Sequence, residues 1–126
     1  MKRIYLASVL ALWCGLSSAA SAPAPVRAEI DALLSRLETS NCQFNRNGSW
    51  YGGREARNHL LRKLEYIEGR TTLQSAEQFI ELAASKSSFS GRAYQVKCGE
   101  DPPVESGRWL TALLESIRGA VEKIKP

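Results

Sequence analysis

Histidine and cysteine are scarce in this sequence, which has one histidine and three cysteines among 126 residues. No free thiol is expected, because one cysteine lies in the predicted signal peptide and the other two are predicted to pair, so a zinc site of His and Cys side chains lacks ligands. The acidic residues lack the spacing of a calcium-binding loop. Neither a glycine-rich phosphate loop after a predicted strand nor a Gly-x-Ser-x-Gly nucleophile motif occurs. We therefore predict no bound metal or cofactor, and no motif defines a reaction.

Long apolar runs are also missing after the first two dozen residues, so no later segment is predicted to span a membrane. The start of the chain has three parts: a basic stretch at residues 1–3, an apolar run at 4–16 and small residues at 17–22. This order is typical of a secretory signal peptide. The sequence therefore predicts an exported protein.

The cleavage site follows from the small residues that a signal peptidase requires. Pro23 disfavours cleavage after Ala22, so the predicted signal peptide is residues 1–20, with cleavage after Ala22 as the alternative. A lipoprotein would have a small residue before its lipidated cysteine, whereas Trp13 precedes Cys14. The sequence therefore argues against a lipid anchor.

Residues 21–126 have the length of a single small domain. Two of the 17 basic residues leave with the signal, so 15 remain against 13 acidic ones and the net charge falls from +4 to +2. This near-balance and the predicted export both argue against a nucleic-acid partner. Cys42 and Cys98 are the two cysteines that remain, and an even pair in an exported chain predicts a disulfide.

Four segments carry apolar residues at helical spacing: 26–37, 56–67, 76–84 and 109–124. Ser75 and Gln78 form a capping-box pattern before the third. In the last segment we expect every apolar residue of the stripe to point inward, down to Val121 and Ile124. All four segments are predicted to be amphipathic packing helices.

Two short extended segments, 42–46 and 94–98, lie between these helices. If the disulfide joins antiparallel strands, the period of two brings one buried face together. The resulting register places Cys42 opposite Cys98, Phe44 opposite Val96 and Arg46 opposite Tyr94. We predict a helix-dominated α+β domain, with four helices around a two-stranded antiparallel ribbon.

Several short motifs follow one another in a fixed order from Phe44 to Leu114. They are Phe44-Asn45-Arg46-Asn47-Gly48, Ala56, His59-Leu60, Lys63, Ser75-Ala76-Glu77-Gln78-Phe79-Ile80, Ala84-Ser85, Ser87-Ser88, Ser90-Gly91, Tyr94 and Trp109-Leu110. This order resembles the YfeK-like family of small exported bacterial proteins. The resemblance implies a Gram-negative periplasmic location, and it carries over no activity, ligand or catalytic residue. The cysteine pair is not part of the pattern.

The second predicted helix carries a pair of polar residues that could form a site. His59 and Lys63 lie four residues apart, on one helical face beside an apolar stripe. The structural interpretation is that His59 is a hydrogen-bonded boundary residue. The functional interpretation is an anion-binding spot, in which Lys63 supplies charge and His59 donates a hydrogen bond.

Two polar loops border the same end of the predicted ribbon. Residues 46–49 read as a turn, with Arg46 and Asn47 at its start, and the serine-rich run 85–91 precedes Tyr94. Either loop could be a plain solvated connection. If instead they face a ligand, the shared sheet edge under the second helix would hold a pocket.

These observations leave two main functional hypotheses. We favour a non-enzymatic binding or accessory module of the cell envelope, in which Arg46, Asn47, His59, Lys63, Ser88 and Tyr94 hold an anionic component or a protein partner. The alternative is a small periplasmic hydrolase that uses Ser88 or Ser90 as nucleophile and His59 as base. A third possibility is a helical surface that binds another protein through its mixed charges.

Overall fold

The computed structural model describes residues 21–124. The predicted signal peptide, with Cys14 in it, lies outside these residues. None of the described helices is long and apolar enough to cross a membrane. In chain order the elements are α1 (Ala24–Thr39), β1 (Gln43–Arg46), β2 (Ser49–Tyr51), α2 (Gly53–Glu68), α3 (Ala76–Ala83), β3 (Gln95–Lys97), β4 (Val104–Glu105) and α4 (Ser106–Ile124).

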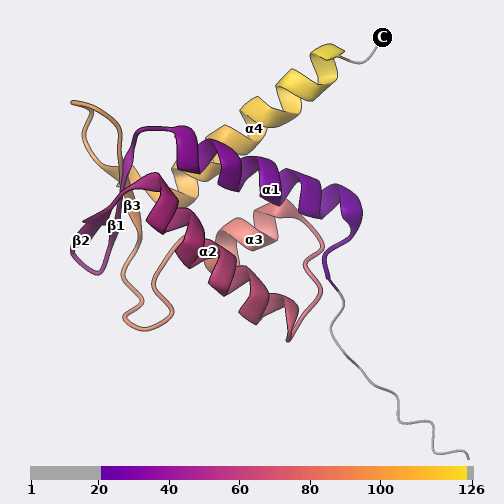
Figure 1. The fold of residues 1–126 in the computed structure, drawn as a ribbon, viewed down its shortest axis with the longest axis horizontal. Helices are drawn as coiled ribbons and strands as arrows, with labels where there is room; N and C mark the ends of the chain where they lie inside the picture. Colours follow the sequence, from indigo (N-terminus) through magenta and orange to yellow (C-terminus); the bar gives the residue numbers. More distant parts are fainter. Residues whose placement is uncertain (1–20, 125–126) are drawn as a thin grey trace, which may run out of the picture.

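All four predicted helices are present, and α1 and α2 lie side by side along much of their length (Figure 1). Their apolar stripes meet in one core, which contains Ile30, Leu33 and Leu37 of α1 and Leu60 and Leu64 of α2. The spacing of three and four residues places these side chains on one face of each helix. Burial of this shared face holds the helices together.

The capping pattern before α3 is confirmed in its first half. The Ser75 hydroxyl accepts a hydrogen bond from the backbone N–H of Gln78, at 3.1 Å. In a full capping box, the Gln78 side chain would also accept a hydrogen bond from the backbone N–H of Ser75. In this structure it accepts from the backbone N–H of Gln74 instead. The cap orients α3 so that Phe79 and Ile80 face the core.

The sheet is larger than the sequence predicts, since the described residues form four antiparallel strands in the order β2-β1-β3-β4. The predicted central pair is confirmed, with Phe44 opposite Val96. The prediction of a two-stranded ribbon is wrong because β2 and β4, with three and two residues, are too short to show alternation. The β1–β3 ladder ends at Asn45 and Gln95, one pair short of the predicted Arg46–Tyr94 pair.

The predicted turn at residues 46–49 connects β1 to β2. Its two central residues, Asn47 and Gly48, have φ angles of 52° and 87°. Asn and Gly tolerate these positive angles, which a two-residue hairpin turn needs to match the twist of its strands. The turn therefore folds β2 back along β1, toward the start of α2.

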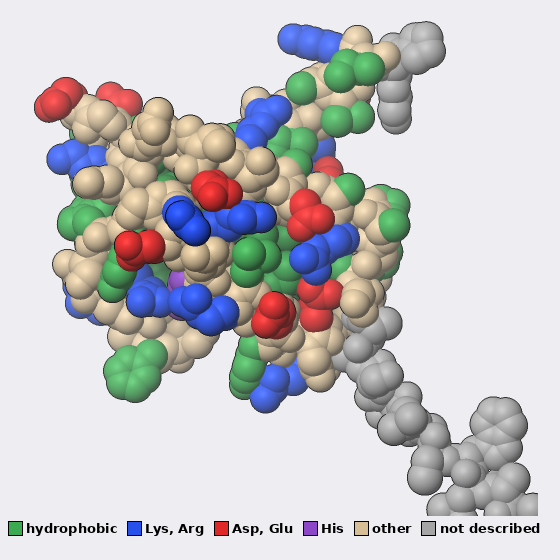
Figure 2. Space-filling view, viewed as in Figure 1, with side chains coloured by type: hydrophobic (Ala, Val, Ile, Leu, Met, Phe, Trp, Pro, Cys, Tyr) green, Lys and Arg blue, Asp and Glu red, His purple; other side chains and the backbone are tan. Residues whose placement is uncertain are grey.

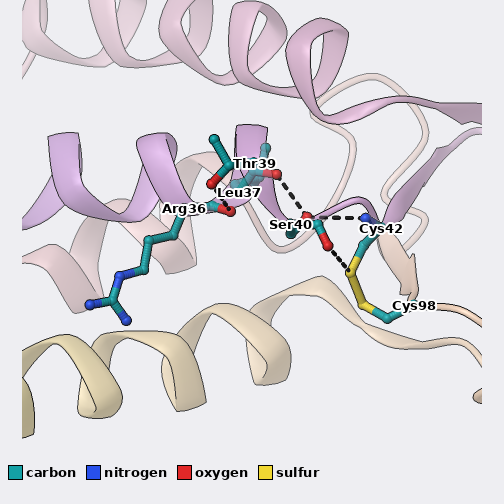
Figure 3. Close-up of a disulfide and its surroundings, with 6 residues drawn as sticks. All are labelled: Arg36, Leu37, Thr39, Ser40, Cys42 and Cys98. Carbon is teal, nitrogen blue, oxygen red and sulfur yellow. Dashed lines mark hydrogen bonds between the residues drawn. A yellow bond between two sulfur atoms is a disulfide. The ribbon is translucent and has the colours of Figure 1, made fainter.

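Cys42 and Cys98 form the predicted disulfide, which links the start of β1 to the end of β3 (Figure 3). Their Cα atoms lie 4.3 Å apart and the bond closes a separation of 56 residues. The Ser40 hydroxyl donates to the carbonyl of Leu37 and accepts from the backbone N–H of Cys42. The disulfide joins the two central strands, and the hydrogen bonds of Ser40 connect them to the end of α1.

The last turns of α4 extend away from the rest of the molecule (Figure 1). Val121 is 52% exposed and Ile124 is 81% exposed, whereas Leu110 and Leu114 are buried. The prediction that Val121 and Ile124 point inward is therefore wrong. The apolar residues of α4 continue at helical spacing beyond the part of the helix that packs against α1 and α3.

Candidate functional site

All six residues of the predicted polar site line one open groove, with a volume of about 770 Å³. The groove lies between α2, the β1–β2 hairpin and the loop from Ser85 to Tyr94. A smaller cavity of about 190 Å³ adjoins it. The lining residues that the two share are Arg46, Tyr51, His59, Arg62 and Tyr94. The structure thus brings the predicted residues together, at the sheet edge under α2.

A chain of hydrogen bonds joins four of these residues at the centre of the site. The Arg46 guanidinium contacts His59 Nδ1 through Nη1, and His59 Nε2 lies 3.0 Å from the Tyr94 hydroxyl. Lys63 Nζ donates to the same hydroxyl, at 3.1 Å, and to the carbonyl of Lys86. The chain connects β1, α2 and the loop before β3.

The contacts of His59 assign its protonation state. A guanidinium can only donate, so Nδ1 must accept and the ring proton of the neutral imidazole lies on Nε2, facing Tyr94. Burial, together with the nearby charges of Arg46, Lys63 and Arg62, lowers the pKa of His59 from 6.5 to about 4. His59 is therefore uncharged at neutral pH, and it orients Arg46 and Tyr94 rather than adding positive charge.

The depressed pKa of His59 predicts a loss of stability on acidification. The unfolded chain takes up the imidazole proton below pH 6.5, whereas the folded chain resists it until about pH 4. Folding stability should therefore fall between pH 7 and pH 5, by about 1 kcal/mol after allowance for a half-exposed ring. Urea unfolding at the two pH values measures this change.

His59→Gln is the matched control, because it removes the titrating group and keeps a polar side chain. The variant should be nearly as stable at pH 5 as at pH 7. Arg118 also lowers the pKa of Glu29 and Glu77 from 4.5, so these carboxylates lose stabilising contacts mainly below pH 4.5, and they do so equally in the variant and the original protein. An equal loss of stability in the variant and the original protein would show that His59 is not the source.

Burial also changes the pKa of two other residues in this chain of hydrogen bonds, Lys63 and Tyr94. It lowers the pKa of Lys63, with help from Arg46, and it raises the pKa of Tyr94. The Tyr94 hydroxyl accepts from both His59 and Lys63, so its own proton is directed to a different acceptor. Tyr94 can thus donate to a ligand oxygen in the groove.

The second loop meets the hairpin turn through Asn47. The Asn47 side chain donates to the Ser87 hydroxyl, at 3.2 Å, and accepts from the Ser90 hydroxyl. Ser87 is 4% exposed and also accepts from the backbone N–H groups of Phe89 and Ser90. Ser88 lines the groove and is exposed. Within the serine-rich run, Ser87 is therefore the residue that shapes the loop.

The observed contacts do not assemble a serine nucleophile with a histidine base. Both ring nitrogens of His59 are engaged, one with Arg46 and the other with Tyr94. The Ser90 hydroxyl donates to Asn47 instead. A nucleophile and its base should lie within hydrogen-bond reach. The geometry therefore lends no support to the hydrolase hypothesis.

The groove is strongly basic. Its lining includes Arg46, Arg62, Lys63 and Arg70, and none of the described residues that line it is acidic. Figure 2 shows Lys and Arg side chains next to the small area of histidine surface. Uncompensated positive charge in a concave site attracts anions.

Some basic residues elsewhere on the surface are paired with carboxylates. Arg118 contacts Glu29 at 2.7 Å and Glu77 at 2.6 Å, and Arg27 contacts Asp31 and Glu68. Within residues 21–124, by contrast, Arg46, Arg62 and Lys63 make no ion pair with a carboxylate. Their charges are therefore available to a ligand.

Sequence reasoning missed several residues of the groove. Tyr51 comes from the unpredicted strand β2, and the Arg46 guanidinium carbon lies 5.0 Å from the centre of its ring. Arg70 follows the glycine that ends α2, and Phe89, 98% exposed, lies in the serine-rich loop. The Asn-Gly turn was the available signal for Tyr51, because such a turn predicts a second strand after it.

The chain matches a known protein family over most of its described residues. The model of DUF5329, a family of unknown function, matches residues 24–118. The chain belongs to the DUF5329 family. The match spans every helix and strand of the domain except the last turns of α4. Those turns are also the part of α4 that extends away from the core.

The chain is also similar to an individual bacterial protein. The chain is 39% identical, over 95 residues, to the uncharacterized protein YfeK of Salmonella typhimurium, covering 75% of this chain and 77% of the relative. The resemblance to the YfeK-like family is thus confirmed. No solved structure matches the chain. The names of the DUF5329 family and of YfeK state no activity.

Proposed function

We propose that the protein is a non-enzymatic binding module of the periplasm, and that its basic groove holds an anionic component of the cell envelope. The observation that carries this proposal is the set of cations in the groove, which form no ion pair with a carboxylate of the described residues. Cationic side chains in a partly desolvated site bind anions through charge-assisted hydrogen bonds. A neutral His59 fits this role, because it holds Arg46 and Tyr94 in place.

The periplasmic location rests on two features of the chain. Residues 1–20 have the composition of a signal peptide, and Cys42 and Cys98 form a disulfide. Disulfides persist in oxidising compartments such as the bacterial periplasm and are rare in the cytosol. Both features therefore favour export.

The test is thermal unfolding of the exported protein with inorganic phosphate, peptidoglycan fragments or vesicles of anionic lipid. A ligand that binds only the folded state raises the unfolding midpoint. We expect at least one of these anions to do so, and we expect Lys63→Gln and Arg62→Gln to weaken its binding about tenfold each. Added salt should weaken binding as well.

Arg36→Gln is the matched control. Arg36 is exposed on α1 and lies outside the groove, so this variant also loses one positive charge. It should bind the anion as the original protein does. An unchanged midpoint with every anion would exclude this function and turn attention to a protein partner. Binding that survives both groove substitutions would show that the anion binds elsewhere.

A further inference from the structure

The smaller cavity, next to the basic groove, differs from it in character. Its lining includes four apolar residues from three elements: Leu37 of α1, Phe44 of β1, and Ala56 and Leu60 of α2. Leu37, Phe44 and Leu60 are buried, and their side chains belong to the hydrophobic core. An apolar pocket that opens beside cations favours a ligand with both kinds of group.

The volume of the cavity limits the apolar group. At about 190 Å³ it is slightly larger than an apolar cavity of about 150 Å³ that holds a benzene molecule. One aromatic ring or a branched aliphatic side chain would fill it. A long acyl chain would not fit, so the cavity selects a compact group.

The charges at the mouth select the polar group. Arg46 and Arg62 line both the cavity and the groove, while Glu55 lines the cavity alone. The planar guanidinium of arginine matches the geometry of a carboxylate. Arg46 uses Nη1 to contact His59 and also forms a hydrogen bond with Tyr51, and a guanidinium has further N–H groups that can donate to a ligand. Glu55 would repel a second negative charge, so a singly charged anion fits best.

We propose that the site takes a carboxylate joined to a compact apolar group, with the carboxylate at Arg46 and Arg62 and the apolar group in the cavity. This inference rests on the proposed function and adds the chemical class of its ligand. Two sources share this chemistry. One is a free aromatic or branched carboxylic acid, and the other is the carboxyl terminus of a peptide that ends in an apolar residue.

The test compares three probes on the exported protein by titration calorimetry. Phenylacetate carries both groups, acetate lacks the ring, and phenylacetamide lacks the charge. We expect phenylacetate to bind at least about tenfold more tightly than either of the others. Equal affinity for acetate and phenylacetate would overturn the role of the cavity, and equal affinity for the amide would overturn the role of the carboxylate.

Ala56→Leu tests the cavity itself, because the larger side chain would occupy the space for the ring. It should weaken phenylacetate about tenfold and leave acetate unchanged. Ala120→Leu, at an exposed position of α4 outside the groove and the cavity, is the matched control. If Ala56→Leu unfolds the protein, Arg62→Gln replaces it, and that variant should remove the preference for phenylacetate over phenylacetamide. Unchanged phenylacetate binding in the folded variant would overturn the inference.

The two possible sources are separated with N-acetyl-Ala-Phe and its C-terminal amide. Tighter binding of the acid than of phenylacetate would assign the site to peptide carboxyl termini, and the reverse would assign it to free acids. Failure of this inference is distinguishable from failure of the proposed function. If phosphate or an envelope anion binds the groove while the ring adds nothing, the function stands and the inference fails. If no anion binds at all, both fail.

Discussion

Removal of the Cys42–Cys98 disulfide will lower the free energy of unfolding by about 4 kcal/mol. The bond closes a separation of 56 residues, and in the entropic account a loop of that length restricts the unfolded chain by this amount. A small domain has a total stability of roughly 5–15 kcal/mol, so the loss is a large share. Urea unfolding of the Cys42→Ala/Cys98→Ala double variant measures it.

The oxidised protein with and without reductant is the companion measurement. Reduction should shift the urea midpoint as far as the double substitution does, because both free the same loop. The double variant should show no response to reductant. A midpoint that is insensitive to reductant in the original protein would mean that the two cysteines are not bonded in solution.

Gly53→Ala will destabilise the domain by about 1–3 kcal/mol, although alanine is the better helix former. Gly53 begins α2, and a Cβ atom there would lie 2.5 Å from the carbonyl oxygen of Glu38 and 2.8 Å from that of Leu37. Overpacking of this kind forces backbone shifts. The gain in helix propensity is at most about 1 kcal/mol, so the steric clash should dominate.

Gly52→Ala, one residue earlier, is the matched control. A Cβ atom at position 52 would have no heavy atom within 4 Å, and the φ angle of Gly52 is −72°, which alanine adopts readily. Its stability should change by less than about 1 kcal/mol. Chemical unfolding of the two variants side by side tests the contact between α1 and α2. If the two variants are equally stable, α1 and α2 can move apart at this contact without a loss of stability.

The central features of the fold could be predicted from local sequence patterns. Apolar residues at a spacing of three and four identify the helices, because this spacing matches the helical period. The pairing of Phe44 with Val96 follows from the cysteine pair and the period of two. The Asn47-Gly48 turn follows from the tolerance of these residues for positive φ angles.

The prediction failed where local patterns are short or lack a partner. β2 and β4 are stabilised by pairing with β1 and β3 rather than by their own composition, so their few residues carry no periodic signal. Val121 and Ile124 continue the apolar stripe of α4 without a neighbouring helix to cover it. Periodicity indicates which face of a helix is apolar, but only packing decides whether that face is buried.

The candidate site, like the fold, was predicted only in part from the sequence. The sequence by itself determined which residue types are available, including the Arg46-Asn47 turn and the spacing of His59 and Lys63 on one helical face. Only the tertiary structure decided what they do together. Burial and the charge of Arg46, which lies on another element, lower the pKa of His59 and keep the imidazole neutral, and the apolar residues that line the cavity come from three elements. Charge, burial and hydrogen bonding at a site depend on groups that are distant in sequence, and folding alone brings these within reach.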